Sequence, residues 1–402
     1  MLRNKPWIKK TGALVCTAAL TGGMFAAVAP SSGASALPST IVIGSTMPLT
    51  GSGAAFGDTM LLGEQQAAKY INSHGGVGTN HAKIKIVSLD DQALAAPAVV
   101  DTKQLIKVNH AIGIITTYND PPLAQYKVGQ QLGAPIIAIT NDPAIPNKPN
   151  LYLMGSLFTA EEAVAFNYAK LHNGLKSVGL LYANNYTAYD ISVYQKIADN
   201  VFGSPQTSQT FDATSTDVTT QLQALQAKNP GAISPLASGS LILTVAQDMA
   251  QLKMTQKIVT DAGSLNTPPQ VTTMSAWNGA IAGVPVMNPT SWLNKASVAA
   301  KQGPASIYTE FAANAVYLIK VAVEDLEKAG KAVTGKNVNT QIAALSAKST
   351  PFAAAGTTIN MLPNHTLSCK YTVTQVTSTG TLKVIATIPT ATVVKWVNAA
   401  MK

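Results

Sequence analysis

Residues 41–58 read IVIGSTMPLTGSGAAFGD, and the interpretation of the chain starts from this stretch. The β-branched run at its beginning is typical of a buried strand. Pro48, Gly51 and Gly53 then end the strand and allow the backbone to approach another group closely. We expect a helix to begin near Gly57-Asp58, because an acidic residue is favoured by the free N–H groups of a first helical turn.

The loop that follows this strand has three interpretations. Residues 51–57 almost match the GxGxxG pattern of dinucleotide-binding loops, but the third glycine comes one position late and no acid lies about 20 residues further on. We therefore disfavour nucleotide binding. Two interpretations remain open: the loop only turns the chain, or it forms the rim of a ligand site and offers Phe56 as a stacking surface.

The first 36 residues have the composition of a secretory signal peptide. Four cations near the start precede an apolar segment at 13–29, and the small residues Ala34-Ser35-Ala36 follow it. We expect cleavage near Ala36, so that the mature protein is exported to the periplasm or the cell surface. Lipid attachment at Cys16 is disfavoured because the preceding residue, Val15, is not small.

Composition excludes several classes of function. The formal net charge is +9, four of the cations belong to the signal, and Arg3 is the only arginine. We find no cluster of basic residues, so we expect no nucleic-acid partner.

Cys369 is the only cysteine after residue 36, which rules out an intramolecular disulfide. No later segment reaches 18 uninterrupted apolar residues, and we predict no membrane span.

From residue 37 onward, apolar strand patterns alternate with helical patterns. The predicted strands are 41–46, 83–89, 111–117, 134–140, 177–182, 207–211, 240–245, 257–260, 281–286, 371–376 and 382–388. The predicted helices are 59–72, 99–108, one beginning at Pro121-Pro122, 159–171, 191–202, 217–228, 247–254, 306–328, 339–347 and 392–402. Alternation of this kind predicts an α/β fold with parallel sheets, whose strand ends share one edge where ligands bind.

Several short motifs resemble the branched-chain amino-acid (Leu/Ile/Val) type of periplasmic solute-binding protein that serves ABC transporters. They are the loop from Pro48 to Asp58, Tyr70-Ile71-Asn72, Gly75-Gly76-Val77 and Asp90-Asp91. The resemblance implies the type I periplasmic-binding protein fold, in which two doubly wound, Rossmann-like lobes are joined by three crossovers. Weaker agreement extends over nearly the whole mature chain.

The resemblance also implies where the lobes divide. We place the crossovers near Gly155, Met287 and Ala354. Lobe 1 then comprises residues 37–155 and 288–354. Lobe 2 comprises residues 156–287 and 355–402, and the solute would be held in the cleft between the lobes.

The candidate ligand-binding residues follow from the same resemblance. Thr117 and Thr140 match positions that grip an amino-acid head group, with Tyr118 and Asn141 next to them at the same strand ends. Phe56 matches a ring that flanks the ligand. A second flanking ring is either Tyr186 or Tyr189. The acid that receives a ligand ammonium group falls on Ala262, so Asp261 could replace it only if the loop is shifted.

Because no arginine follows residue 36, a ligand carboxylate cannot be held by a guanidinium fork of the mature protein. It could be held by backbone N–H groups near Asn119-Asp120 and Asn141-Asp142. Strand-end acids such as Asp90, Asp142 and Asp248 are more often helix caps than ligand contacts.

Catalytic patterns are scarce. The chain contains no GxSxG, no HExxH and no paired cysteine motif, and Asp90-Asp91 would point to opposite faces of a strand. We therefore predict a protein with no catalytic residues, metal or cofactor, and keep an exported hydrolase as the alternative. The predicted function is capture of a small polar solute by hinge closure, by a monomer that delivers it to the membrane permease of an ABC importer or, alternatively, to a receptor.

Overall fold

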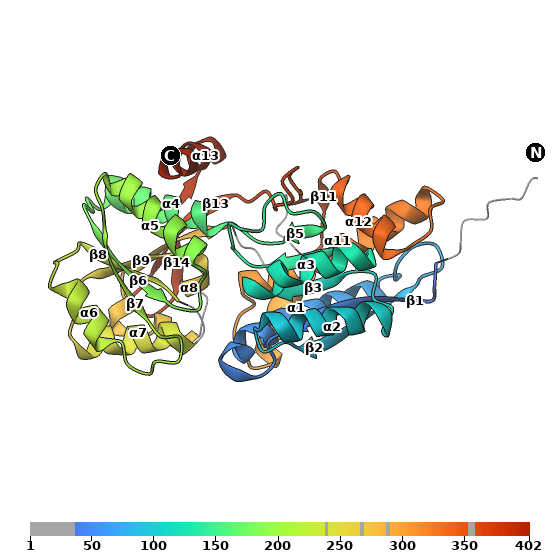
Figure 1. Ribbon diagram of the computed structural model, residues 1–402, viewed down its shortest axis with the longest axis horizontal. Coiled ribbons are helices and arrows are strands. Elements are labelled where there is room, and N and C mark those ends of the chain that lie inside the picture. Colours follow the sequence, from blue (N-terminus) through green and yellow to red (C-terminus); the bar gives the residue numbers. More distant parts are fainter. Residues whose placement is uncertain (1–36, 238–239, 266–268, 287–289, 353–357) are drawn as a thin grey trace, which may run out of the picture. The chain divides into compact units, whose positions relative to one another are not determined.

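The computed structural model describes residues 37–402, except for short stretches at 238–239, 266–268, 287–289 and 353–357 (Figure 1). The predicted signal peptide and the predicted crossovers at Met287 and Ala354 lie outside the described residues. Within the described part of the chain, no helix is both long and apolar enough to span a bilayer.

The first sheet has five strands, and every neighbouring pair in it is parallel. Its order is β2-β1-β3-β4-β5. The strands are β1 (Thr40–Met47), β2 (Lys83–Asp90), β3 (Ile114–Thr117), β4 (Ile136–Ile139) and β5 (Leu151–Leu153). β2 lies at the edge and is only half buried, as its alternation of charged and apolar residues predicted.

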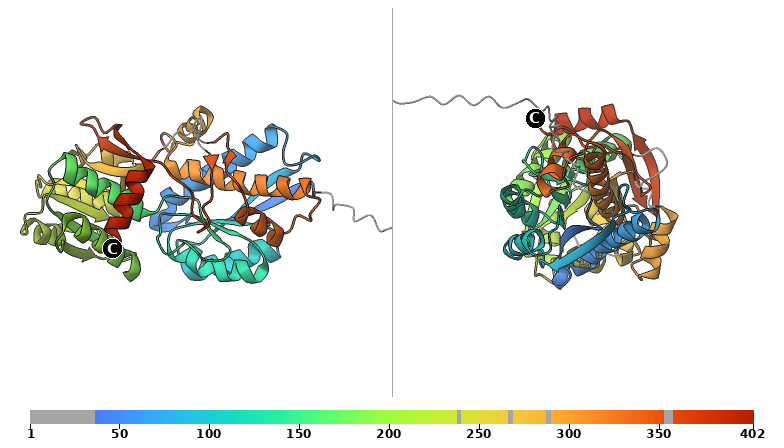
Figure 2. Two further views of the ribbon diagram at one scale, coloured as in Figure 1. Left: turned by 90° about the horizontal axis from the view of Figure 1, so that it is seen from above. Right: turned by 90° about the vertical axis from the view of Figure 1, so that its right-hand side faces the viewer.

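Helices cover both faces of this sheet. One face packs against α1 (Ala54–Ser73) and α11 (Ile307–Lys328), which also pack against each other (Figure 2). The other face packs against α2 (Ala95–Lys107) and α3 (Asp120–Leu132). A parallel sheet needs cover on both faces because each strand is apolar on both sides.

The second sheet has seven strands in the order β14-β13-β10-β9-β8-β6-β7. The neighbouring strands among β6, β7, β8, β9 and β10 pair in parallel. β13 and β14 form an antiparallel hairpin, and β13 pairs antiparallel with β10. The strands are β6 (Val178–Ala183), β7 (Thr207–Phe211), β8 (Ala232–Leu236), β9 (Lys257–Thr260), β10 (Ile281–Pro285), β13 (Tyr371–Val376) and β14 (Leu382–Ile388).

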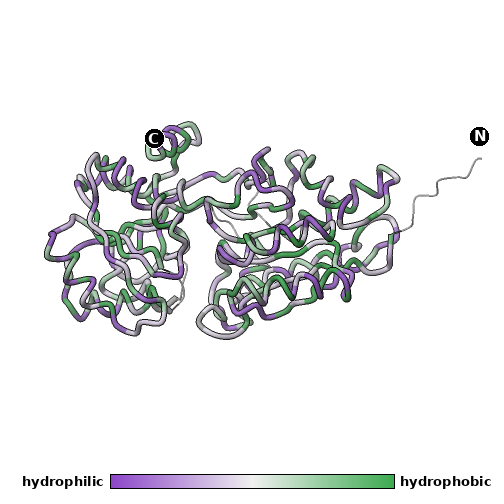
Figure 3. The backbone as a smooth tube through the Cα atoms, viewed as in Figure 1, coloured by the Kyte–Doolittle hydropathy of each residue, from purple (hydrophilic) through white to green (hydrophobic). Residues whose placement is uncertain are grey.

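Helices again cover both faces of the second sheet. One side carries α4 (Phe158–His172), α5 (Ala188–Phe202) and α13 (Thr390–Ala400). The other carries α6 (Thr219–Gln226) and α7 (Ser240–Gln251). The covering helices alternate hydrophobic and hydrophilic residues along their length (Figure 3). The predicted α/β fold with two doubly wound parallel sheets is therefore confirmed.

Smaller elements complete the described chain. They are the 3-10 helices η1 (Gly51–Gly53) and η2 (Ser275–Trp277), the helices α8 (Ala262–Leu265), α9 (Pro269–Thr272), α10 (Ser291–Ala299) and α12 (Gly335–Ala343), and the paired strands β11 (Lys348–Ser349) and β12 (Thr358–Ile359).

One predicted strand is wrong. Residues 240–245 belong to α7. The sequence pattern missed β8 and also the short strands β5, β11 and β12. The apolar run of α7 is buried at Leu241, Ile242, Val245 and Met249, a helical spacing that a short window does not separate from a strand. Pro235 is tolerated in β8 because β9 pairs only with the first two residues of β8, so a missing N–H near its end breaks no bond to β9.

Several helices begin earlier than predicted, among them α2, which begins at Ala95 rather than at residue 99, and α5, which begins at Ala188 rather than at residue 191. α1 starts at Ala54 rather than near Gly57-Asp58, because η1 has already turned the chain and alanine favours the helix. α12 begins at Gly335 rather than at residue 339. Its start is marked by Thr334, whose Oγ1 accepts a hydrogen bond from the Asn337 N–H at 3.2 Å.

Residues 358–367 pair with the part of the chain that carries the first sheet. β12 pairs with β11, and Leu153 of β5 forms a parallel bridge with Thr366. The Leu153 N–H donates to the carbonyl oxygen of His365 at 2.8 Å. These pairings differ from the predicted assignment of residues 355–402 to the second lobe.

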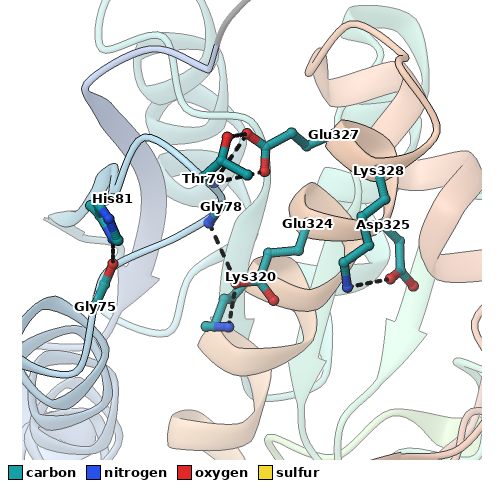
Figure 4. A network of polar contacts seen from close by, with 9 residues as sticks. All are labelled: Gly75, Gly78, Thr79, His81, Lys320, Glu324, Asp325, Glu327 and Lys328. Atoms are coloured by element: carbon teal, nitrogen blue, oxygen red, sulfur yellow. Dashed lines mark hydrogen bonds and ion pairs between the residues drawn. The ribbon is translucent and has the colours of Figure 1, made fainter.

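The loop that follows α1 is fastened to the end of α11 (Figure 4). The Thr79 N–H and hydroxyl donate to the Glu327 carboxylate at 3.0 and 2.7 Å. The Gly78 N–H donates to Glu324, which also pairs with Lys320 at 2.6 Å. The helix that begins at the opening motif is thus tied at its far end to the longest helix.

Gly57 is the glycine of the opening motif on which packing depends most. It lies in the first turns of α1, and a Cβ built on it would collide with the backbone carbonyl of Pro48. The loop between β1 and α1 can therefore fold back on the helix only if residue 57 has no side chain.

We predict that Gly57→Ala lowers the free energy of unfolding by about 1–3 kcal/mol, because the Pro48 backbone must move to accept a methyl group. Thermal or urea unfolding followed by circular dichroism measures this difference. Ala55→Ser on the exposed face of the same helix is the control and should change stability by less than about 0.5 kcal/mol. Equal stability of the Gly57→Ala variant and the native protein would contradict the packing argument.

Candidate functional site

A cavity of about 340 Å³ lies where the carboxyl ends of strands from both sheets meet. From the first sheet it is lined by residues that follow β1, β2, β3 and β4. From the second sheet it is lined by residues that follow β6, β8 and β9. The carboxyl edge of a parallel sheet is the usual place for a ligand, so this cavity is the candidate site.

Six of the eight predicted ligand-binding residues line the cavity: Phe56, Thr117, Tyr118, Thr140, Asn141 and Tyr186. Further lining residues include Asn119, Asp120, Asn184, Asn185, Thr187, Ser240, Gly263 and Tyr308.

Tyr189 and Asp261 are the two predicted residues that are not among the residues lining the cavity. Tyr189 lies on the first turn of α5 with 51% of its surface exposed, whereas Tyr186, just before that helix, faces the cavity. The structure therefore favours Tyr186 over Tyr189 as the second flanking ring.

An aromatic cluster forms one wall of the cavity. Phe56 on the first turn of α1 meets the edges of Tyr118 and Tyr308, with ring centroids 5.5 and 4.7 Å away. Tyr118 has a left-handed backbone with φ of 63°, which turns the chain sharply after β3. Burial raises the pKa of the Tyr308 phenol, so this side chain stays neutral. The wall offers apolar ring surface together with hydroxyl groups.

The two predicted threonines already use their hydroxyl protons. Thr117 is buried and its Oγ1 donates to the Ile139 carbonyl at 2.7 Å. Thr140 donates to Oδ1 of Asn119 at 3.0 Å. In this arrangement both hydroxyl oxygens can still accept a hydrogen bond, but neither offers a proton to a ligand carboxylate.

Asn119 connects the two sheets beside the cavity. Its Nδ2 donates to Oδ2 of Asp190 at 3.2 Å. Asp190 lies in the first turn of α5 and forms a capping box with Thr187, so its position is fixed by the helix start. A polar chain thus runs from Thr140 through Asn119 to the helix of the other sheet.

Two buried acids lie behind the cavity wall. Glu161, in the first turn of α4, accepts hydrogen bonds from the Ala262 N–H at 3.0 Å and from the Ser156 hydroxyl. Asp261 accepts one from the Ser264 N–H at 2.6 Å. Burial raises the pKa of both carboxyls, and the charge of Asp261 raises the pKa of Glu161 further.

Asp261 therefore does not stand at the cavity surface as the predicted ammonium receptor. Its carboxylate caps the short helix α8, and Gly263 of that helix forms the wall in its place. Asp248 lies within α7 rather than at a strand end, and its carboxylate accepts the N–H of Val218, the N-cap residue of α6. Asp142 accepts the Ala144 N–H within a turn, and no helix directly follows it, so the expected capping role does not apply to Asp142.

Sequence reasoning missed several residues of the site, among them Thr187, Glu161, Tyr308 and the side chain of Asn119, of which only the backbone had been considered. Ser306 precedes Tyr308 as the N-cap of the longest helix, a signal that could have placed this ring at a helix start. Glu161 and Asn119 carried no comparable signal, because their neighbours come from distant parts of the chain.

The chain is similar in sequence to known binding proteins. The family model described as "Periplasmic binding protein" matches residues 40–381. An amino acid binding protein from Pseudomonas aeruginosa is 34% identical over 116 residues, which are 29% of this chain. The match spans only 30% of the length of that relative.

Two solved structures illustrate the similarity of fold. The branched-chain amino acid transporter substrate binding protein LivJ from Streptococcus pneumoniae, in complex with isoleucine, superposes with a TM-score of 0.72 at 17% identity, over 87% of this chain and 99% of LivJ. An ABC transporter solute binding protein from R. palustris, in complex with benzoate, gives a TM-score of 0.72 at 17% identity, over 87% and 96% of the two chains.

We predict that Phe56→Ala weakens binding of a small molecule in the cavity by about 1 kcal/mol, roughly a fivefold rise in Kd, because ring surface against the ligand is lost. Isothermal titration calorimetry measures this with the compound that gives the largest thermal shift among amino acids, amides and small aromatic acids. Tyr189→Ala removes an exposed ring close to the cavity and serves as the matched control. If Tyr189→Ala weakens binding and Phe56→Ala does not, the aromatic wall is assigned to the wrong residues.

Proposed function

Because the chain belongs to the periplasmic binding protein family, we propose that it is an exported solute-binding protein that captures a small polar solute and delivers it to an ABC-type importer. The observation that carries the proposal is the cavity at the carboxyl edges of two parallel sheets, lined by residues of both. Its volume of about 340 Å³ suits a ligand of the size of an amino acid. No catalytic step or cofactor is needed for this role.

We place the two lobes as follows. Lobe 1 contains residues 37–155 and 288–367, and lobe 2 contains residues 156–287 and 368–402. The third crossover moves from Ala354 to Cys369 because residues 358–367 pair with β5 and β11. The Cys369 thiol lies 3.7 Å from the Gly155 carbonyl oxygen, so two of the proposed crossovers are neighbours, as a hinge requires.

Capture would occur by closure of the two lobes over the solute. A ligand that contacts Phe56 and Tyr118 of lobe 1 and Tyr186 of lobe 2 binds more tightly when both walls are in place. That difference in affinity is what shifts the equilibrium toward the closed state. The permease would then recognise the closed arrangement.

Small-angle X-ray scattering tests this mechanism. We expect the radius of gyration to decrease when the protein, freed of bound solute, is saturated with a compound that raises its melting temperature, because closure brings the lobes together. Tm alone reports binding, so the two measurements separate binding from closure. A stabilising compound that leaves the scattering curve unchanged would exclude hinge closure.

The solute is proposed to be an amino acid, an amide or an amine rather than a simple carboxylate anion. No lysine, arginine or histidine lines the cavity within the described residues, whereas Asp120 does. The hydroxyls of Thr117 and Thr140 offer acceptors, and Glu161 and Asp261 lie behind the wall. A ligand with N–H donors satisfies the threonine oxygens that line the cavity, and a bare anion does not.

Four compounds that share one side chain differ in charge and in N–H donors: L-leucinamide, L-leucine, 4-methylpentanamide and 4-methylpentanoate. At pH 7 we expect 4-methylpentanoate to bind at least about tenfold more weakly than the best of the other three, since it alone brings a net negative charge and no N–H donor. Calorimetric titration gives the four Kd values. Preferential binding of 4-methylpentanoate would overturn the solute class and leave solute binding intact.

A further inference from the structure

Two buried carboxyl groups, one from each proposed lobe, touch beside the cavity. Asp142 follows β4 of the first sheet, and Asp190 belongs to the first turn of α5 beside the second sheet. Neither side chain is exposed to solvent. The carboxyl of Asp142 is hydrogen-bonded to that of Asp190. Two carboxylates can form such a bond only if one of them carries a proton, so the contact holds a shared proton.

The other bonds of the pair identify the oxygens involved. Oδ1 of Asp142 accepts the Ala144 N–H at 2.7 Å. Oδ2 of Asp190 accepts the Thr187 hydroxyl at 2.8 Å and the Asn119 amide at 3.2 Å. The remaining oxygens, Oδ2 of Asp142 and Oδ1 of Asp190, are buried and reach no N–H or O–H donor among the described residues. These two oxygens are therefore the ones available to a proton shared between the carboxyls.

The charges around the pair are acidic. Asp190 from α5 and Asp120 from the start of α3 both raise the pKa of Asp142. Neither Asp142 nor Asp190 takes part in an ion pair within the described chain. Burial, followed by the charge of Asp190, raises the pKa of Asp142 from its ordinary 3.8 to about 8.

We propose that Asp142 and Asp190 form a proton-dependent latch between the two lobes, which holds them together only while one proton is shared between the two carboxyls. The inference rests on the proposed hinge closure, since a latch needs an open state in which the pair is separated. Closure then takes up a proton, and alkaline pH favours opening.

The direction of the pH effect follows from the different proton affinities of the Asp142 carboxyl in the open and closed states. In the open state the Asp142 carboxyl is exposed to water and its pKa returns toward 3.8, whereas in the closed state its pKa is about 8. The ratio of closed to open molecules therefore falls about tenfold for each pH unit between these two values. Above about pH 8 the Asp142 carboxyl is ionised in both states, and the ratio of closed to open molecules becomes constant.

Single-molecule energy transfer measures this ratio directly. Donor and acceptor dyes are attached to cysteines at Lys107→Cys in lobe 1 and Lys228→Cys in lobe 2, in a Cys369→Ser background. The solute-free chain is then observed from pH 5.5 to 9.0. We expect the closed fraction to be largest at pH 5.5, with a closed-to-open ratio at least tenfold lower at pH 8 than at pH 6.

Two substitutions at Asp142 separate the shared proton from other effects. Asp142→Asn supplies its own N–H to Asp190 and should give a ratio that is independent of pH. Asp142→Ala removes the latch. Its closed-to-open ratio should be low at every pH and equal to that of the native protein at pH 9. Asp248→Asn, at a carboxyl on α7 whose pKa is also raised by burial, is the matched control and should keep the native pH response.

The outcomes distinguish the latch from the proposed function. A single population at every pH, a pH-independent ratio in the native protein, or a native pH response in the Asp142→Asn variant overturns the latch. If the populations nevertheless shift toward closure with 10 mM L-leucine, hinge closure stands without the latch. A native pH response that Asp142→Asn abolishes and Asp248→Asn retains supports the shared proton.

Discussion

The common direction of the strands within each parallel sheet is the constraint on which the rest of the structure depends. Both faces of such a sheet must be covered by helices, so the only accessible surface near the strands is the edge formed by their ends. In this protein the loops after β3 and β4 meet the loops after β6 and β9 at that edge. The cavity is thus a consequence of topology before any particular side chain is considered.

Close packing of backbone on backbone keeps the lip of the cavity in place. Gly57 allows Pro48 to rest on α1, and α1 is held along its length by α11 and at its far end by the bonds of Thr79 to Glu327. Phe56 lies on the first turn of α1, next to Gly57, and is held in place by the same packing. Its ring can therefore meet Tyr118 and Tyr308 in a fixed geometry rather than move with a free loop.

The electrostatic character of the site comes from acids that have no basic partners. Glu161, Asp261, Asp142 and Asp190 are buried near the cavity, and backbone N–H groups, hydroxyls and amides take the place of basic side chains. Burial raises the pKa of Glu161, Asp261 and Asp142, and none of these carboxyls forms an ion pair within the described residues. A site of this kind favours ligands that donate hydrogen bonds or carry positive charge.

The sequence by itself determined the succession of strands and helices, the two parallel sheets and the strand ends that carry the site, because apolar periodicity and glycine or proline punctuation are local signals. The resemblance of its motifs to a known family also predicted that Phe56 and Thr117 share one site, with either Tyr186 or Tyr189 as a further ring. Only the tertiary structure decided that residues 240–245 are helical, that Asp261 caps α8, and that Asp142 meets Asp190. Each of these depends on partners far away in the chain, and local pattern carries no information about such partners.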